Sequence, residues 1–295
     1  MRVFVTGATG YVGFAVTQEL IRGGHSVLGM SRSDTGAAAL KDAGADVHRA
    51  LLDDIDGIKR GAEGADAVIH CAFNHDFSKF RDNCAHDARV IHALGSVFEG
   101  SDRPLIVTSG TALVLGRVST EDDLAPSGPH VNPRTATEHA LAEVAARGVR
   151  GIALRLPQVH GDNDHGFVRM VINRARERGK VAMIGDGANR WPAVHRNDLA
   201  RLYRLVLENG KSPRYHGVAE EGVPFRAIAE VIGRRLKLPV VSKTLEEAAE
   251  YYGWFTHFAS MDAPSSAAKT RAELDWQPAG PTLLADMDRA EYFAM

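Results

Sequence analysis

The sequence predicts an α/β fold in which a doubly wound parallel sheet is followed by a smaller C-terminal lobe. In the first half, short apolar and β-branched runs alternate with amphipathic stretches of helical period. Strands that are separated by helices pair in parallel through right-handed crossovers. This alternation becomes irregular after Pro157. We therefore expect a sheet domain over 1–157 and an interleaved lobe over 158–295 that lies across the carboxyl edge of the sheet, where such folds bind ligands.

The individual elements follow from the same patterns. Apolar runs predict strands at 3–5, 26–30, from 47 onward (weakly), 65–70, 105–108 and 151–155. Amphipathic stretches predict helices at 14–21, 35–43, 135–146, 167–178, 198–207 and 225–236. Asp34 is the expected N-cap of the second helix, because a short acidic side chain can accept hydrogen bonds from the first free N–H groups.

Composition excludes several classes of protein. The chain has 295 residues, with 35 Lys and Arg against 37 Asp and Glu, a formal charge of −2. This balance favours neither nucleic acid nor an anionic membrane as a partner, and no apolar run approaches the roughly 18 residues of a membrane span. Cys71 and Cys84 are too few for a disulfide framework, and we expect no metal site. We expect a cytoplasmic protein.

A glycine-rich segment, TGATGYVG at 6–13, lies between the first strand and the first helix. Gly7 permits a tight turn, Gly10 lets backbone N–H groups approach a pyrophosphate, and Gly13 lets the helix pack closely on the strand. The N-terminus of the helix then faces the anion. The alternative is an ordinary glycine turn, but the position favours a dinucleotide. The residues expected to contact it here are Gly7, Thr9, Gly10, Tyr11, Val12 and Gly13.

The end of the second strand distinguishes the two nicotinamide dinucleotides. NAD sites usually place an acid there for the ribose hydroxyls, whereas NADP sites supply Arg for the 2′-phosphate. Ser31 and Arg32 follow the strand, and Arg binds phosphate through a charge-assisted fork. Asp34 lies farther along and is interpreted as a helix cap. The sequence therefore predicts NADP(H), the alternative being that Arg32 is a solvated surface charge.

Six segments together resemble the extended short-chain dehydrogenases/reductases, the superfamily that includes nucleotide-sugar epimerases and dehydratases. They are 6–13, 67–72 (AVIHCA), 108–116, 155–161, 193–198 (AVHRND) and 274–278 (LDWQP). The resemblance implies a Rossmann-type fold and several further cofactor contacts. Adenine would lie near the backbone of Leu52, the adenosine ribose near Cys71 and Ala72, and Ser109 near nicotinamide or ribose. The implied walls of the nicotinamide site are Leu156 and Pro157.

The chain departs from this family at its acid–base pair, Tyr-x-x-x-Lys. Arg134 and Glu138 stand at the two expected positions, and no lysine in the chain follows a tyrosine by four residues. Arg134 and Glu138 are expected to pair with each other on one helical face. The departure resembles atypical members, which include reductases of bulky natural-product ketones such as polyketides of antibiotic biosynthesis, and catalytically silent cofactor sensors.

Two sources of the reaction proton remain open, His139 and the substrate. Thr111 occupies the family's catalytic Ser position and can orient a carbonyl, although its hydroxyl is too weak an acid to act alone. His139 has a suitable pKa, but it lies about 100° round the helix from Glu138, and many histidines are merely surface or core residues. The other source is the substrate itself, through a phenol beside its ketone.

The predicted substrate site is large and apolar. Its candidate residues also fit ordinary core packing, but an aromatic and Met lining suits a flat polycyclic ligand better than a sugar diphosphate. These candidates are Phe73, Phe167, Met183, Trp191 and Trp254.

These observations predict an NADPH-dependent ketoreductase that acts on a bulky, aromatic, polyketide-like small molecule. A sugar-nucleotide epimerase or dehydratase is the first alternative, disfavoured because those reactions need a strong base. A non-catalytic NADP(H) sensor is the second; it would keep the glycine loop alone, whereas this chain also keeps Thr111. The resemblance also allows a homodimer.

Overall fold

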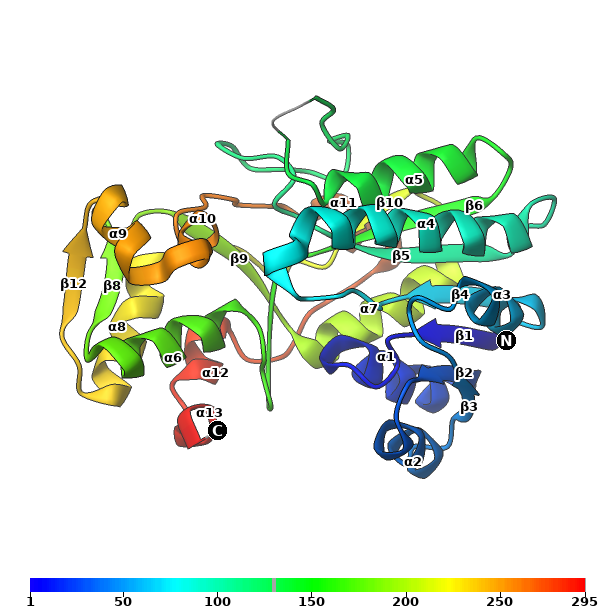
Figure 1. The fold of residues 1–295 in the computed structure, drawn as a ribbon, viewed down its shortest axis with the longest axis horizontal. Helices are drawn as coiled ribbons and strands as arrows, with labels where there is room; N and C mark the ends of the chain where they lie inside the picture. The colour runs from blue at the N-terminus through cyan, green and yellow to red at the C-terminus, as the bar shows by residue number, and fades with distance from the viewer. Residues whose placement is uncertain (129–130, 295) are drawn as a thin grey trace.

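The computed structural model describes residues 1–128 and 131–294. Its centre is a seven-stranded sheet with the order β3-β2-β1-β4-β5-β6-β10, and every neighbouring pair is parallel (Figure 1). This confirms the predicted doubly wound α/β fold. The strands of this sheet are β1 (Arg2–Thr6), β2 (Ser26–Ser31), β3 (Asp46–Arg49), β4 (Ala67–His70), β5 (Pro104–Gly110), β6 (Arg150–Leu156) and β10 (Arg214–His216).

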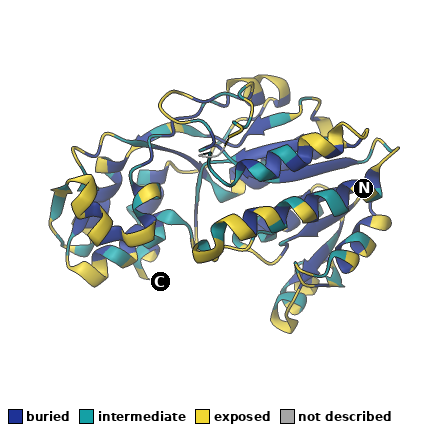
Figure 2. Cartoon of the chain, turned by 45° about the horizontal axis from the view of Figure 1, so that its top comes forward, coloured by how far each residue is buried: buried dark blue, intermediate teal, exposed yellow. Residues whose placement is uncertain are grey.

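Helices cover both faces of the sheet, and their apolar sides form two separate buried layers (Figure 2). One layer lies under α1 (Tyr11–Arg22), α2 (Asp34–Asp42) and α7 (Arg196–Asn209). The other lies under α3 (Ile55–Glu63), α4 (Phe80–Phe98) and α5 (Thr135–Ala145). Helices α3 and α4 were not predicted from the sequence. In α4 the signal was present, because Val90, Ile91, Leu94 and Phe98 follow helical spacing and are fully buried.

The N-cap of α2 is Ser33 and not Asp34. Ser33 has an extended backbone, with φ −125° and ψ 157°, and its side chain accepts a hydrogen bond from the Gly36 N–H at 3.1 Å. Asp34 already lies in the first turn, where its charge favours the helix N-terminus. The carboxylate of Asp34 instead forms an ion pair of 2.7 Å with Arg49 at the end of β3.

The C-terminal lobe has a core of its own, in which Trp191 and Phe225 are fully buried. Two small sheets, β7-β9-β11 and β8-β12, support it. Their strands are β7 (Gln158–His160), β8 (Val181–Ile184), β9 (Arg190–His195), β11 (Glu220–Pro224) and β12 (Val240–Lys243). The helical elements of the second half that remain are α6 (Phe167–Arg178), α8 (Phe225–Leu236), α9 (Leu245–Tyr252), η2 (Gly253–Phe255), α10 (Thr256–Ala259), α11 (Ala268–Leu274), α12 (Leu283–Met287) and α13 (Ala290–Ala294).

The chain crosses between the two lobes more than once. After residue 157 it returns to the first lobe to add α7 and the edge strand β10. Trp276 also belongs to the first core, and its indole N–H donates to the Asp198 carbonyl at 3.1 Å. The lobes are thus interleaved, because segments of the second half complete the core and the sheet edge of the first lobe. Within residues 1–128 and 131–294, no helix has both the length and the apolar character required to cross a bilayer.

Candidate functional site

The glycine loop lies at the carboxyl edge of the sheet, and its three glycines meet different surroundings. Gly7 has φ +66°, and a Cβ there would lie 2.7 Å from the Ala72 nitrogen. A Cβ at Gly13 would lie 2.1 Å from the Gly7 carbonyl oxygen. A Cβ at Gly10 would meet only that same oxygen, at 3.2 Å. Gly7 and Gly13 are therefore required for folding, whereas a Cβ at Gly10 would need only a small shift of the Gly7 carbonyl and otherwise faces open space.

This open space is suited to the pyrophosphate of a dinucleotide. Gly10 is the N-cap of α1 and makes no side-chain cap, and both Thr9 and Gly10 are exposed. The first N–H groups of α1, from Tyr11 and Val12 onward, then face the loop without a capping oxygen. Such a helix N-terminus favours a phosphate group.

Basic groups gather where the second strand ends. Arg32 is exposed, and Ser31 is buried with its hydroxyl donating to the Ser33 carbonyl at 3.0 Å. Arg49, which the sequence analysis did not select, is in register with Ser31 on β3 and also donates to the Ser33 carbonyl. Arg49 binds the Asp34 carboxylate and partly neutralises its charge. This carboxylate is therefore less available to accept hydrogen bonds from a ribose.

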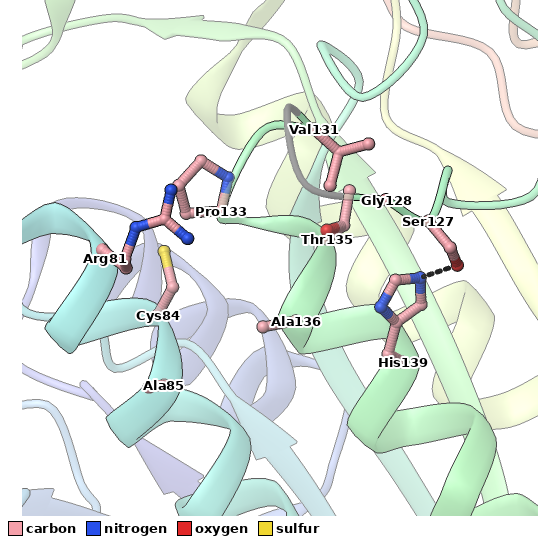
Figure 3. Close-up of a pocket in the computed structure, with 10 residues that line it drawn as sticks. All are labelled: Arg81, Cys84, Ala85, Ser127, Gly128, Val131, Pro133, Thr135, Ala136 and His139. Carbon is pink, nitrogen blue, oxygen red and sulfur yellow. Dashed lines mark hydrogen bonds between the residues drawn. The ribbon is translucent and has the colours of Figure 1, made fainter.

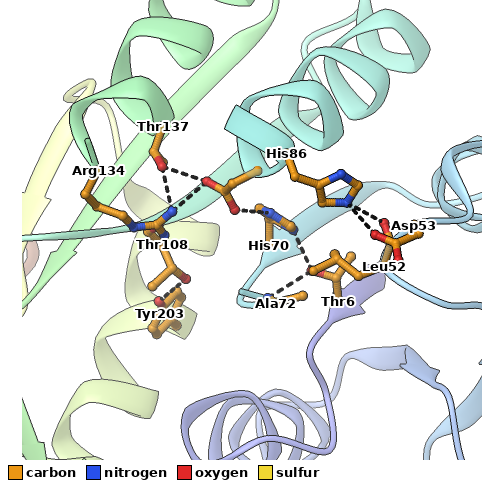
Figure 4. Close-up of polar contacts among 11 residues, drawn as sticks. Thr6, Leu52, Asp53, His70, Ala72, His86, Thr108, Arg134, Thr137 and Tyr203 are labelled. Carbon is orange, nitrogen blue, oxygen red and sulfur yellow. Dashed lines mark hydrogen bonds and ion pairs between the residues drawn. The ribbon is translucent and has the colours of Figure 1, made fainter. Parts of the chain in front are cut away.

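A buried polar chain runs from the first strand to the position where the resemblance places a catalytic tyrosine (Figure 4). Thr6 Oγ1 and His70 Nδ1 are 2.7 Å apart, and His70 Nε2 lies 3.1 Å from Asp87. The same carboxylate accepts a bond of 2.7 Å from Arg134. Burial alone would raise the pKa of Asp87, but Arg134, His70 and Thr137 outweigh it and hold the pKa well below its usual range.

Arg134 is held by several groups besides Asp87. It donates to Thr137 Oγ1 at 2.7 Å and to the Thr108 carbonyl at 2.9 Å. Its guanidinium also lies 4.1 Å from the centre of the Phe73 ring. The expected pair between Arg134 and Glu138 is therefore wrong: Arg134 immediately precedes α5 and reaches across to α4, and Glu138 turns toward β6.

Glu138 forms the second buried ion pair of this region. Arg155 on β6 donates to its two carboxylate oxygens at 2.7 Å each, and the Arg155 side chain is 1% exposed. Ser109, predicted to lie near nicotinamide or ribose, donates its hydroxyl to Glu138 at 2.8 Å. Both positions that the resemblance assigns to Tyr and Lys are therefore held in ion pairs with other elements.

The network around Asp87 predicts a pH dependence of stability. The folded-state pKa of Asp87 is below the unfolded value of about 3.9. The contribution of Asp87 to the free energy of unfolding is therefore complete above the unfolded pKa and is lost as pH falls through the folded-state pKa. Urea unfolding should show the free energy of unfolding falling more steeply below pH ~4 in the native protein than in Asp87→Asn. Equal slopes for the two proteins would contradict this assignment.

The two predicted catalytic residues lie in different places. Thr111 follows β5 and is buried, with its N–H donating to the Leu156 carbonyl at 3.1 Å and its hydroxyl 3.5 Å from the same oxygen. It thus adjoins Leu156, one of the two residues predicted to form the nicotinamide wall. His139 instead lies 3.3 Å from Ser127 Oγ and 3.3 Å from the Ala125 carbonyl.

His139 lines a surface pocket of about 370 Å³ between α4 and α5 (Figure 3). Arg81 and Cys84 of α4 line the opposite side, and neither Thr111 nor a residue of the glycine loop contributes to the lining among the described residues. The structure therefore does not bring the two predicted catalytic side chains together in this pocket.

The remaining predicted cofactor contacts lie along the same edge. The Leu52 carbonyl accepts a bond of 3.0 Å from His86, and the Ala72 N–H lies 3.3 Å from Thr6 Oγ1 (Figure 4). Burial raises the pKa of the Cys71 thiol to about 11, so this thiol stays protonated at neutral pH.

The residues predicted for the substrate site fall into two groups, one at the surface between the lobes and one in the C-terminal core. Phe77, in the short helix η1 (Phe77–Lys79), stacks on Trp254 with centroids 5.0 Å apart and also contacts Phe167 at 5.9 Å. Trp254 is 55% exposed, so this aromatic contact joins the two lobes at the surface. Trp191 is instead buried in the C-terminal core, and Met183 packs partly against it. The sequence analysis missed Phe77, whose partners are distant in sequence.

Comparisons with known proteins agree with this arrangement. The model of the NAD dependent epimerase/dehydratase family matches residues 3–218. An uncharacterized protein of Schizosaccharomyces pombe is 46% identical, over 99% of this chain and 100% of its own. The 2-alkyl-3-oxoalkanoate reductase of Stenotrophomonas maltophilia is 28% identical, over 85% of this chain and 80% of its own.

Among solved structures, UDP-glucuronic acid 4-epimerase from Bacillus cereus, in complex with UDP-glucuronic acid and NAD, superposes with a TM-score of 0.75. It is 17% identical and covers 99% of this chain and 98% of its own, a likeness of fold alone. The family match, the sheet order and the glycine loop together indicate an oxidoreductase-type enzyme that depends on a nicotinamide dinucleotide. The chain belongs to the NAD dependent epimerase/dehydratase family.

Proposed function

We propose that the protein is an NADPH-dependent ketoreductase that reduces the carbonyl of a bulky, aromatic, polyketide-like substrate. The observation that carries the proposal is the aromatic contact of Phe77, Phe167 and Trp254 between the lobes, beyond a loop that is open to a dinucleotide at Gly10. An apolar wall of this kind favours an apolar ligand. The similarity to a 2-alkyl-3-oxoalkanoate reductase also supports reduction of a ketone that carries apolar groups.

The occupants of the acid–base positions favour ketone reduction over sugar-nucleotide chemistry. Arg134 and Glu138 are each fixed in a buried ion pair, and a guanidinium does not release its proton at workable pH. Neither residue therefore offers the strong base that epimerisation or dehydration needs. Bound NADPH supplies the hydride, and the protein has only to hold the ketone, which we assign to Thr111, and provide one proton.

We propose NADP(H) as the cofactor because Arg32 follows the second strand and Arg49 ends the neighbouring third strand, in register with Ser31. Arg32→Ala should remove most of the preference for NADPH over NADH, on the order of 1–3 kcal/mol or about 5- to 150-fold in affinity. Fluorescence titration with both coenzymes measures this change. Arg22→Ala, which removes an exposed arginine at the other end of α1, is the control. Equal affinity of the unmodified protein for the two coenzymes would contradict the assignment.

Turnover of a ketone panel tests the reaction class. The absorbance of NADPH should fall when the protein is mixed with polycyclic quinones and phenolic aromatic ketones. It should stay constant with UDP-sugars and dTDP-sugars, whose products should also be analysed for epimerised or dehydrated sugar. Conversion of a nucleotide sugar would favour the epimerase alternative. Tight NADPH binding without turnover of any ketone would favour a cofactor sensor.

A further inference from the structure

We propose that His75 donates the reaction proton to the carbonyl oxygen of the substrate. This inference rests on the ketone reduction proposed above and deepens it. The segment that carries His75 follows β4 at the carboxyl edge of the central sheet. In the doubly wound sheet, β4 neighbours β1, so this segment emerges beside the glycine loop.

The path of residues 71–77 places His75 between the cofactor loop and the second lobe. At its start, Ala72 lies against the glycine loop, since a Cβ at Gly7 would come within 2.7 Å of the Ala72 nitrogen. At its end, Phe77 stacks on Trp254 of the C-terminal lobe. Along the chain His75 lies between these two contacts, and the proposal places the substrate beside it, between the cofactor loop and the aromatic wall.

The surroundings of the imidazole are mainly aromatic. The ring of His75 lies 5.3 Å from that of Phe73, nearly perpendicular to it, and 6.1 Å from that of Phe77. Phe73 in turn carries the guanidinium of Arg134, 4.1 Å from its ring centre. His75 thus lies close to the arginine at the expected tyrosine position, and His75 itself is exposed to solvent.

The groups around His75 determine how readily its imidazolium releases a proton. Partial desolvation by the surrounding protein and the positive charge of Arg134 lower the pKa of His75, and a hydrogen bond with the Phe73 backbone partly opposes them. Asp87 of α4 is bound by Arg134, and the carboxylate of Asp76 accepts the Ser78 N–H at 3.1 Å. A lowered pKa makes the imidazolium a stronger acid toward a forming alkoxide.

The proposed step balances as a two-electron reduction. Bound NADPH would supply the hydride that reduces the carbonyl carbon and would itself be oxidised to NADP⁺. As the π electrons of the carbonyl move to oxygen, this oxygen takes the proton of the His75 imidazolium; the N–H bond breaks and the alcohol O–H bond forms. The neutral imidazole then regains a proton from water at its exposed edge. Reduction therefore requires protonated His75 and slows as pH rises through its pKa.

The other proton sources fit the structure less well. His139 faces Ser127 and Ala125 in the pocket between α4 and α5, which Thr111 does not line. A substrate that carries a phenol could supply the proton itself. The choice of ketone distinguishes this alternative from proton donation by the protein. Fluorenone has no acidic proton, whereas its hydroxy derivative with the phenol beside the ketone does.

The test compares His75→Gln with His139→Gln in the complete protein, with NADPH and fluorenone. His75→Gln should lower kcat/KM for fluorenone by roughly 10²–10⁴ and remove the loss of rate with rising pH. His139→Gln should keep both the rate and the pH profile. NADPH affinity, measured by fluorescence, should be unchanged in both. Added imidazole should partly restore His75→Ala, which a merely structural role would not allow.

A second readout does not depend on turnover. NMR titration of the His75 ring in the NADPH complex should give a pKa below the ordinary value of about 6.5, matching the pH profile of the native enzyme. Retention of rate and pH profile by His75→Gln, while the native protein reduces fluorenone, would overturn the role of His75 and leave the ketoreductase intact. Turnover of the hydroxy ketone alone would assign the proton to the substrate. Failure of the native protein with every ketone would instead overturn the function.

Discussion

Gly10→Val should abolish NADPH binding and leave the fold intact. A Cβ at Gly10 meets only the Gly7 carbonyl oxygen, at 3.2 Å, and the backbone of Gly10 has an ordinary φ of −80°. The protein should therefore accommodate the added side chain by a small shift of the Gly7 carbonyl, and this side chain would occupy the space of the pyrophosphate. Fluorescence titration should detect no NADPH binding, and circular dichroism should be unchanged.

Two other glycines are controls for this result. Gly64→Val, at the exposed end of α3, should bind NADPH normally, because it lies at the opposite edge of the sheet and its Cβ would approach only the Arg2 side chain, at 3.4 Å. Gly13→Ala should instead destabilise the fold, since its Cβ would lie 2.1 Å from a backbone oxygen. Near-normal affinity of Gly10→Val would show that the phosphates lie elsewhere.

Glu138→Ala should destabilise the protein by about 3–5 kcal/mol, because it leaves the Arg155 guanidinium buried without its counter-ion. Arg155 would keep only weaker partners, such as the Asp123 carbonyl at 2.7 Å. Urea unfolding measures the change in the free energy of unfolding.

Glu143 on the same helix provides a matched control. Its carboxylate is 65% exposed and lies 3.3 Å from His92, so Glu143→Ala should change the free energy of unfolding by less than about 1 kcal/mol. A similarly small effect of Glu138→Ala would mean that the pair with Arg155 is not structural, and would reopen a chemical role for Glu138.

Local patterns in the sequence predicted much of the fold. The bounds of α6 and α8 agree with the predicted ranges 167–178 and 225–236, because Gly166 and Pro224 precede the two helices and periodic apolar residues fill them. Short elements were missed: β10 has three residues and is recognisable only from its pairing with β6. A strand of that length carries no period of its own.

The candidate site could be predicted only where it is local. The glycine loop is one continuous segment, so spacing alone located it. The expected pair of Arg134 and Glu138 came from a rule for isolated helices, but the observed partner of Arg134 is Asp87, 47 residues away. A buried charge is stabilised by whichever opposite charge tertiary packing brings near, and spacing along one helix does not contain that information. Arg49 and Phe77 were also missed, because tertiary packing and not local spacing brings them to their partners Asp34 and Trp254.

Transfer of deuterium from NADPH to a ketone tests the proposed function most directly. NADPH deuterated at the transferred position of the nicotinamide is incubated with the protein and fluorenone, and the alcohol is analysed by mass spectrometry. Ketone reduction predicts a single deuterium on the carbon that carried the carbonyl, and none when Gly10→Val replaces the native protein. Absence of deuterated alcohol across the ketone panel, with NADPH bound and unconsumed, would contradict a ketoreductase.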